Sequence, residues 1–247
     1  MIKVENIDIW GFEHAIRGMR NPMNSWEKSD SRFDRDVDCG STSDNCASCE
    51  CFKDKDCGTY FIGPNDLALM KKLFAAGTEH RKYLRQIFVS MDITAPLYWW
   101  KEFDTYKVGV TANSCSTMHK IADKEFTLED FSCEHLLTAT DGYLSAVTVD
   151  GEVVFYSPFG FMKMTCEILN YYRMFFLETK DKTYWWQMIQ LLPSSYNQKR
   201  TVTMNYENVA AIIRQRTGHK LDEWNNFVDI LKGLPYVSEI MKKEVTE

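Results

Sequence analysis

Arg216 stands at the end of an apolar helical stripe, where a charge calls for a partner. Residues 206–217 are expected to form a short amphipathic helix, with Val209, Ile212 and Ile213 on its apolar face. Arg216 follows Val209 by seven positions and returns to within about 20° of that stripe, whereas Arg214 points away. An inward guanidinium needs an anion or several acceptors, because burying an unpaired charge costs several kcal/mol. The alternative is that Arg216 only caps the helix C-terminus before Gly218, where a cation is favoured.

Five cysteines in one polar window suggest a second kind of chemistry. They lie in the stretch CGSTSDNCASCECFKDKDC, at Cys39, Cys46, Cys49, Cys51 and Cys57. Closely spaced thiols in a reducing compartment indicate a metal more readily than disulfides, and Cys46-x-x-Cys49 has zinc-knuckle spacing. The window is therefore either a site for zinc or another thiolate-bound metal, or a polar surface insertion with reduced thiols. The separate Cys115, Cys133 and Cys166 are expected in the core.

Local motifs of catalysis are missing from the sequence. It contains no nucleophile elbow, no phosphate-binding P-loop and no GxGxxG, and its five histidines show no HxxxH or HxH spacing. The pattern of residues alone therefore identifies no catalytic group.

The elements that must position these residues alternate between strands and helices. Strands are expected at 2–10, 85–93 and 198–204, and a hairpin at 143–157 around Asp150-Gly151. Helices are expected from residue 11 and at 63–77, 160–178 and 184–192, and Asn205 is a good N-cap for the helix that carries Arg216. Residues 20–57 have few apolar anchors and are predicted to form a long loop. The fold class is α+β, with a mixed sheet and long helices.

Length and charge limit the function. The chain of 247 residues is 45% hydrophobic, enough for a substantial core, and we expect a single domain over 1–247 with a Cys-rich insertion at about 30–58. A net charge of −6 argues against binding of a nucleic acid duplex, while a local basic pocket could still hold one phosphate. No signal peptide and no membrane span is expected, and a cytoplasmic location is predicted.

A family resemblance rests on two stretches of sequence. LPSSYNQKRTVTMNYENVAAIIRQRTGH resembles the C-terminal segment of the flavin-dependent thymidylate synthases, in which Leu-Pro is followed by a strand, an Asn-capped helix, an Arg that ends the helix and a nearby His. FVSMDITAPLYWWKEFDTYKVGVTANSCSTMHK resembles the same family's central strand, helix and nucleotide loop, with Asn113 and Ser116 at the matching turn. The resemblance loosely covers 1–235, and its specific patches are 88–120 and 191–224.

The sequence also departs from the family pattern. Tyr106-Lys107-Val108 stands where the family has Arg-His-Arg, whose charges hold the flavin. Met118 replaces the Arg that follows the nucleotide-loop serine, and Ile189 replaces another family arginine. Two phosphate contacts are thereby lost, each a charge-assisted hydrogen bond worth about 1.5 to 3 kcal/mol.

The resemblance implies an activity, its cofactors and its site residues. The activity is reductive methylation of dUMP to dTMP, with FAD as hydride carrier, NADPH as reductant and methylenetetrahydrofolate as carbon donor, in a homotetramer whose sites lie at subunit junctions. The implied pyrimidine-nucleotide contacts are Arg216, Ser116, Asn113, Lys199 and Arg200. The implied cofactor contacts are Lys107, Asn205 and His219. The alternative is a nucleotide-binding or structural protein of the same fold without catalysis, which a metal in the Cys-rich loop could stabilise.

Overall fold

The computed structural model describes residues 2–34, 59–138, 145–149 and 152–242, and all structural statements refer to these. Its chain divides into two compact units, each assembled from separate segments. The first unit contains Met1–Ile7, Met91–Val202 and His219–Phe227. The second contains Asp8–Ser90, Thr203–Gly218 and Val228–Glu247.

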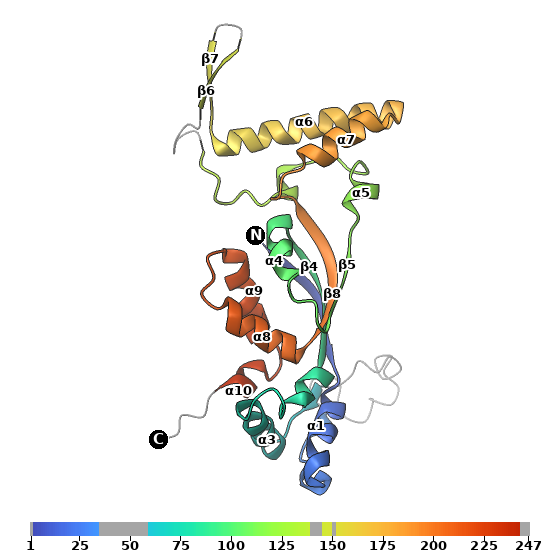
Figure 1. Ribbon diagram of the computed structural model, residues 1–247, viewed down its shortest axis with the longest axis vertical. Helices are drawn as coiled ribbons and strands as arrows, with labels where there is room; N and C mark the ends of the chain where they lie inside the picture. The colour runs from blue at the N-terminus through green and yellow to red at the C-terminus, as the bar shows by residue number, and fades with distance from the viewer. Residues whose placement is uncertain (1, 35–58, 139–144, 150–151, 243–247) are drawn as a thin grey trace, which may run out of the picture. The chain divides into compact units, whose positions relative to one another are not determined.

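A four-stranded sheet has the order β1-β4-β8-β5 (Figure 1). Its strands are β1 (Lys3–Trp10), β4 (Phe88–Pro96), β8 (Asn197–Asn205) and β5 (Val110–Ser114). On β4 the alternate residues Val89, Met91, Ile93 and Ala95 are buried, and those between them are half-exposed, which is the period-two pattern of a strand with one covered face. The predicted strands at 2–10 and 198–204 are confirmed. The strand predicted at 85–93 exists but starts later, at Phe88, because Arg85 and Gln86 belong to a 3-10 turn. The short edge strand β5 was not foreseen as a strand of its own.

Two packed helices supply one apolar core of the first unit. They are α6 (Pro158–Thr179) and α7 (Lys182–Leu191), both predicted from the sequence. Ser157 caps α6 through a hydrogen bond from the Gly160 N–H, and the helix ends at Lys180 in the left-handed conformation. The two helices and the segment that precedes them in the chain form a buried cluster. This segment includes α5 (Thr117–Lys120) and the 3-10 turn η5 (Leu128–Asp130). Its members are Ile121, Ala122, Phe126, Phe131, Met162, Cys166, Leu169 and Met188.

An aromatic cluster joins α4 (Leu97–Phe103) to the start of α9 (Asp222–Lys232). The ring centroids of Trp99 and Trp224 lie 4.6 Å apart, and those of Trp99 and Phe103 lie 5.1 Å apart. Each of these large side chains is almost completely buried, so the cluster fixes the helix that follows β4. The hairpin of β6 (Ser145–Val149) and β7 (Glu152–Tyr156) also belongs to this unit, and its antiparallel pairing confirms the predicted hairpin.

The second unit is mainly helical. Its elements are α1 (Phe12–Arg20), the 3-10 turns η1 (Asn21–Met23), η2 (Trp26–Lys28) and η4 (Lys82–Gln86), the pair β2 (Arg32–Asp34) and β3 (Thr59–Phe61), α3 (Pro64–Ala75), α8 (Tyr206–Arg216) and α10 (Val237–Met241). Tyr206 and Tyr236 contact the Phe12 ring edge-on at 5.7 Å, and Arg81 forms an ion pair of 2.7 Å with Glu207.

The prediction of a long loop over 20–57 was wrong in its described part. Two short 3-10 turns and the strand β2 occupy it. β2 pairs with β3, which follows the Cys-rich segment in the sequence. The pairing partner lies after that segment in the chain, so no local pattern could show it. In the described part of the chain, no helix has both the length and the apolar character needed to cross a bilayer.

Candidate functional site

The junction of β5 and β8 brings the two family-like stretches of sequence together. The Cys115 N–H donates to the Lys199 carbonyl at 2.9 Å, and the Gln198 side-chain amide donates to the Cys115 carbonyl at 2.8 Å. The turn that carries Asn113 and Ser116 is therefore fastened to the strand that carries Lys199 and Arg200. Four of the predicted nucleotide contacts belong to one local structure.

The turn itself is open to solvent. Asn113, Cys115 and Ser116 are exposed, and the Ser116 hydroxyl accepts the His119 N–H at 3.0 Å, which caps α5. The expectation that Cys115 lies in the core was wrong. Cys115 is exposed, because it directly follows β5, an edge strand of the described sheet whose last residues are exposed as well. Cys166 is buried as predicted, and Cys133 is half-buried.

Lys199 is held by a carboxylate on the neighbouring strand. Its ammonium lies 3.0 Å from Asp92, which also accepts hydrogen bonds from Thr201 at 2.6 Å and Asn6 at 2.9 Å. These hydrogen bonds, from Thr201 first and then Asn6 and Lys199, lower the pKa of Asp92 to about 2. The carboxylate is ionised at neutral pH and balances the charge of Lys199.

Arg200 is also engaged within the protein. Its guanidinium donates to Asp104 at 2.7 Å and to the Gln198 side-chain oxygen at 3.0 Å, and it lies 4.2 Å from the centre of the Trp100 ring. Such stacking and pairing give the side chain a fixed position. A nucleotide phosphate would have to compete with Asp104 for this cation.

The three predicted cofactor contacts differ in whether their side chains are already engaged within the protein. Lys107 is exposed, and no ion pair involves it within the described residues. The Asn205 side-chain oxygen accepts the Asn208 N–H at 3.1 Å, and the Asn208 side-chain oxygen accepts the Asn205 N–H. The two residues thus form a reciprocal cap at the start of α8. This confirms the N-cap expected from the sequence.

His219 faces a carboxylate. Its Nδ1 accepts the Leu221 N–H at 3.2 Å, which places the ring proton on Nε2, 3.4 Å from Glu102. Glu102 also accepts the indole N–H of Trp224 at 3.0 Å. His219 is thereby tied to the aromatic cluster of the first unit.

Arg216 is the last residue of α8 and is half-buried, whereas Arg214 is exposed, as the helical spacing predicts. Arg216 belongs to the second unit, and Asn113 and Ser116 belong to the first. The closure of Arg216 on the Ser116 turn therefore stays a prediction.

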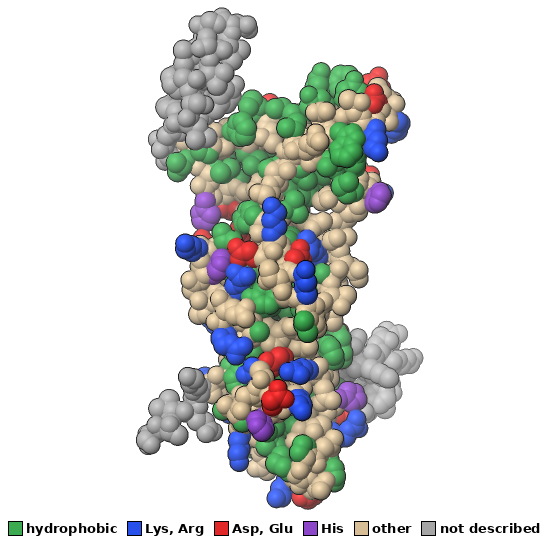
Figure 2. All heavy atoms as spheres, in the orientation of Figure 1, with side chains coloured by type: hydrophobic (Ala, Val, Ile, Leu, Met, Phe, Trp, Pro, Cys, Tyr) green, Lys and Arg blue, Asp and Glu red, His purple; other side chains and the backbone are tan. Residues whose placement is uncertain are grey.

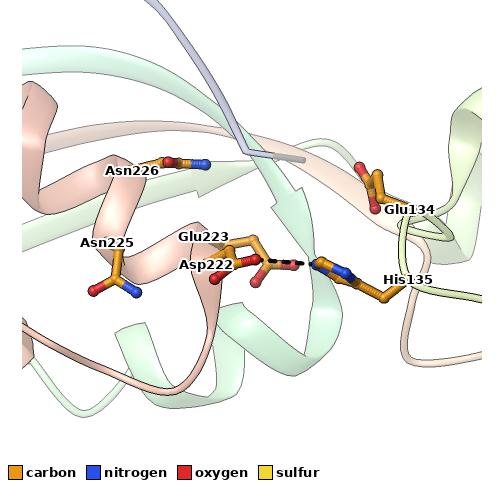
Figure 3. Close-up of a pocket in the computed structure, with 6 residues that line it drawn as sticks. All are labelled: Glu134, His135, Asp222, Glu223, Asn225 and Asn226. Atoms are coloured by element: carbon orange, nitrogen blue, oxygen red, sulfur yellow. Dashed lines mark ion pairs between the residues drawn. The ribbon is translucent and has the colours of Figure 1, made fainter.

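A cavity of about 280 Å³ lies beside the start of α9 (Figure 3). It is lined by Glu134, His135, Asp222, Glu223, Asn225 and Asn226. Figure 3 shows His135 and Asp222 pointing toward one another, and the His135 Nε2 lies 3.2 Å from the Asp222 carboxylate. No sequence motif indicated this cavity, because its two contributing segments are far apart in the chain.

The inner wall of the cavity is a buried carboxylate. Glu223 is only 7% exposed and accepts hydrogen bonds from Tyr98 and, at 3.4 Å, from Ser132. Burial, together with the Glu223 hydrogen bond, raises the pKa of Tyr98 to about 12, so Tyr98 is a neutral donor at physiological pH. Three carboxylates in one cavity repel phosphate and suit a cation or a hydrogen-bond donor.

The five predicted metal ligands Cys39, Cys46, Cys49, Cys51 and Cys57 lie outside the described residues. Within the described ranges, no group of three or more His, Cys, Asp or Glu side chains is arranged to hold a metal ion. The zinc prediction is therefore restricted to the Cys-rich window.

No family model and no curated protein matches the sequence, whereas solved structures match the fold. One is a flavin-dependent thymidylate synthase, ThyX, from Helicobacter pylori, at a TM-score of 0.59 and 15% identity over 97% of this chain and 98% of that one. Another is the UMP/dUMP methylase PolB from Streptomyces cacaoi, at a TM-score of 0.52 and 10% identity over 94% of this chain and 87% of that one. The chain thus has the α+β fold of the flavin-dependent thymidylate synthases.

Proposed function

We propose that this protein binds a pyrimidine nucleoside monophosphate and methylates its base, converting dUMP to dTMP with FAD, NADPH and methylenetetrahydrofolate. The observation that carries the proposal is the strand, cap and helix around Arg216. β8 spans Asn197–Asn205, Asn205 caps the next helix, and α8 ends at Arg216, which is the order of elements in the family-like stretch. The shared fold extends this likeness over nearly the whole chain.

The ligands of the similar structures support this class of substrate. The Helicobacter pylori enzyme was solved with FAD and dUMP, and the Streptomyces cacaoi methylase with 5-bromo-UMP. Both nucleotides are uridine monophosphates, which combine one phosphate with a uracil edge rich in acceptors and donors. A planar fork of donors such as the Arg216 guanidinium suits either group. We propose dUMP or UMP as the substrate class.

The fit to FAD is incomplete within one chain. When bound, FAD would act as the hydride carrier. Of the residues matched to flavin contacts, the exposed Lys107 can meet a diphosphate, while Asn205 caps α8 and His219 faces Glu102. Composite sites in a homotetramer would add contacts from other chains, and we include this assembly and a cytoplasmic location in the proposal.

A second candidate follows from the cations that are already engaged. Lys199 pairs with Asp92 and Arg200 pairs with Asp104, and Tyr106-Lys107-Val108 offers one charge where the family has more. These observations favour a protein that binds the nucleotide without flavin and does not methylate it.

Calorimetric titration with dUMP and UMP tests nucleotide binding. Arg216→Lys is expected to weaken binding by roughly 1.5 to 3 kcal/mol, about tenfold or more, because lysine cannot form the bidentate contact. Arg214→Lys, on the exposed side of the same helix, is the matched control and should bind like the unmodified protein. If Arg216 only caps the helix, both variants should behave alike, since lysine also suits a helix C-terminus. No binding of either nucleotide by the unmodified protein would remove both candidates.

Flavin absorbance separates the two candidates. Protein that binds dUMP, retains FAD through purification and forms dTMP from dUMP, methylenetetrahydrofolate and NADPH has the first function. Protein that binds dUMP while remaining colourless and inactive in the presence of added FAD has the second.

A further inference from the structure

The cations of β8 are neutralised within the protein. Figure 2 shows basic side chains next to acidic ones over the part of the molecule where Figure 1 has β4 and β8. Lys199 pairs with Asp92 and Arg200 pairs with Asp104, so each of these charges is compensated. Binding of a nucleotide anion at this place therefore depends on the N–H donors that the protein leaves unused and on the direction in which they point.

Gln198 on β8 connects the turn of Asn113 and Ser116 to Arg200. It is only 8% exposed, and both ends of its amide are engaged. The amide nitrogen donates to the Cys115 carbonyl at 2.8 Å, and the amide oxygen accepts the Arg200 Nε–H at 3.0 Å. The orientation of the amide follows from these partners, because a carbonyl only accepts and a guanidinium only donates. Glutamate and methionine, the side chains closest in size, both lack the donor.

The first of these hydrogen bonds fixes the peptide that leads into Ser116. β8 holds both main-chain groups of Cys115, because the Lys199 carbonyl accepts its N–H at 2.9 Å and Gln198 donates to its carbonyl. In a trans peptide the next N–H points opposite to the carbonyl, and the described residues contain no cis peptide. The Ser116 N–H therefore points away from β8, toward the open edge of the sheet, and no described residue accepts it.

The second hydrogen bond fixes the guanidinium of Arg200. Gln198 accepts its Nε–H, Nη1 donates to Asp104 at 2.7 Å, and the group lies 4.2 Å from the centre of the Trp100 ring. The Trp100 indole N–H in turn donates to the Gln198 main-chain carbonyl at 2.9 Å. Nη2 donates to no described residue. Gln198 and Asp104 together thus determine which edge of the guanidinium is left for a ligand.

The turn has few other contacts that could hold it in place. Asn113, Cys115 and Ser116 are all exposed, so burial contributes little to their order. Without Gln198, one hydrogen bond to the Lys199 carbonyl would connect Cys115 to β8. An exposed segment held by so few hydrogen bonds opens at low free-energy cost. A ligand would then have to order the turn as it binds, which lowers its affinity.

We propose that Gln198 is a positioning residue of the nucleotide site. Its amide holds two of the predicted nucleotide contacts, the Ser116 turn and Arg200, in the geometry that binds the nucleotide, and it does so before the nucleotide arrives. Gln198 acts through these neighbours and does not contact the substrate itself. This inference rests on the proposed nucleotide binding and adds the residue that organises the site.

Calorimetric titration of the full-length protein with dUMP tests the role. Gln198→Met keeps the size of the side chain and removes both hydrogen bonds, and we expect it to weaken dUMP binding about tenfold. Gln198→Glu removes the donor and adds a second carboxylate beside Arg200, so it should weaken binding more than Gln198→Met. Packing alone predicts the reverse order, since glutamate has the shape of glutamine. Gln187→Met on α7 is the control and should bind normally, because its amide makes one hydrogen bond, at 3.4 Å, within its own helix.

Hydrogen exchange of the protein without nucleotide measures the positioning directly. In Gln198→Met the main-chain N–H groups of residues 113–117 should exchange several times faster than in the unmodified protein. Those of α6 and α7 should be unchanged, because their core contains no part of this network. Faster exchange throughout the first unit, together with a lower melting temperature, would show a purely structural role and overturn the inference.

The remaining outcomes separate this inference from the proposed function. If the unmodified protein binds neither dUMP nor UMP, the proposed function fails and the positioning role fails with it. If the unmodified protein binds dUMP and Gln198→Met binds it equally well, the positioning role alone is overturned. Unchanged exchange at residues 113–117 in Gln198→Met would also reject it, whatever the affinity for the nucleotide.

Discussion

Among the carboxylates of the described residues, Asp66, at the start of α3, accepts an unusually large number of hydrogen bonds. It is completely buried and accepts Arg20 at 2.6 Å, the Ser29 and Ser31 hydroxyls at 2.7 and 2.6 Å, and the N–H groups of Asp30 and Ser31 at 3.1 Å. Burial alone would raise the pKa of Asp66, but hydrogen bonds from Ser31, Ser29 and Arg20 lower it below its usual value. One charge thus joins residues 29–31 to α1 and α3.

Asp66→Asn is expected to lower the free energy of unfolding by about 3–5 kcal/mol, because it leaves the Arg20 guanidinium buried without its counter-charge. Urea denaturation measures the loss. Asp229→Asn, which removes a surface pair with Lys232, should cost less than about 1 kcal/mol. The folded pKa of Asp66 lies below its unfolded value, so this stabilisation is complete above the unfolded pKa of about 3.9 and is lost as the pH falls through the folded pKa. Equal urea midpoints for the two variants at neutral pH would contradict the proposed role.

At the scale of elements, the segment from β8 to α8 shows how local signals set structure. β-branched residues favour the strand, Asn205 ends it and begins the helix, and the apolar spacing of Val209, Ile212 and Ile213 gives α8 its buried face. Each of these signals lies within a few residues of the structure that it specifies. The bounds of this segment were therefore predictable from the sequence.

Asn205→Ala is expected to lower the free energy of unfolding by about 1 kcal/mol, because the N–H of Asn208 loses its acceptor. Asn205→Ser keeps an acceptor and should retain most of the stability, as thermal or chemical denaturation would show. If Asn205 also contacts a cofactor, as the family resemblance implies, Asn205→Ser should lose cofactor affinity at nearly normal stability. Equal stability of the alanine and serine variants would mean that the cap is unimportant.

Other elements and contacts lay beyond what the sequence could specify. β5 is short and exposed, so it lacks the alternation that identified β4. The pairings of Lys199 with Asp92 and of Arg200 with Asp104 join residues about a hundred positions apart, and the sequence showed the cations without their partners. The acidic cavity near His135 depends in the same way on two distant segments. Local periodicity predicts elements, whereas tertiary contacts decide which charges remain available.

At the scale of the whole molecule, the sheet order explains why a divergent sequence can keep a recognisable fold. Strands β8 and β5 are neighbours although about eighty residues separate them, and each carries one of the two family-like stretches. The strand order could not be derived from periodicity. The resemblance of the stretches at 88–120 and 191–224 indicated the fold without the strand order, and the structural match at 15% identity agrees with that fold.

The Cys-rich window remains a predicted metal site. Protein purified without chelators is expected to contain about one zinc per chain by elemental analysis, and Cys46→Ser with Cys49→Ser should abolish it. Cys115→Ser, which changes an exposed thiol in the described part of the chain, is the control and should leave the metal content unchanged. Metal removal should not shift the main unfolding transition, because the described cores are built without these cysteines. Absence of metal in the unmodified protein would end the hypothesis.

The pairing of β2 with β3 has a consequence for how this chain tolerates change in length. The ladder sets Asp34 opposite Thr59, so the two residues that flank the intervening stretch of chain are held next to each other. Lengthening a loop whose ends are already held together adds little entropic cost, since that cost grows only with the logarithm of its length. The stretch between these residues can therefore be exchanged, shortened or extended in evolution or in the laboratory as a cassette, while the ladder keeps the same two anchor points.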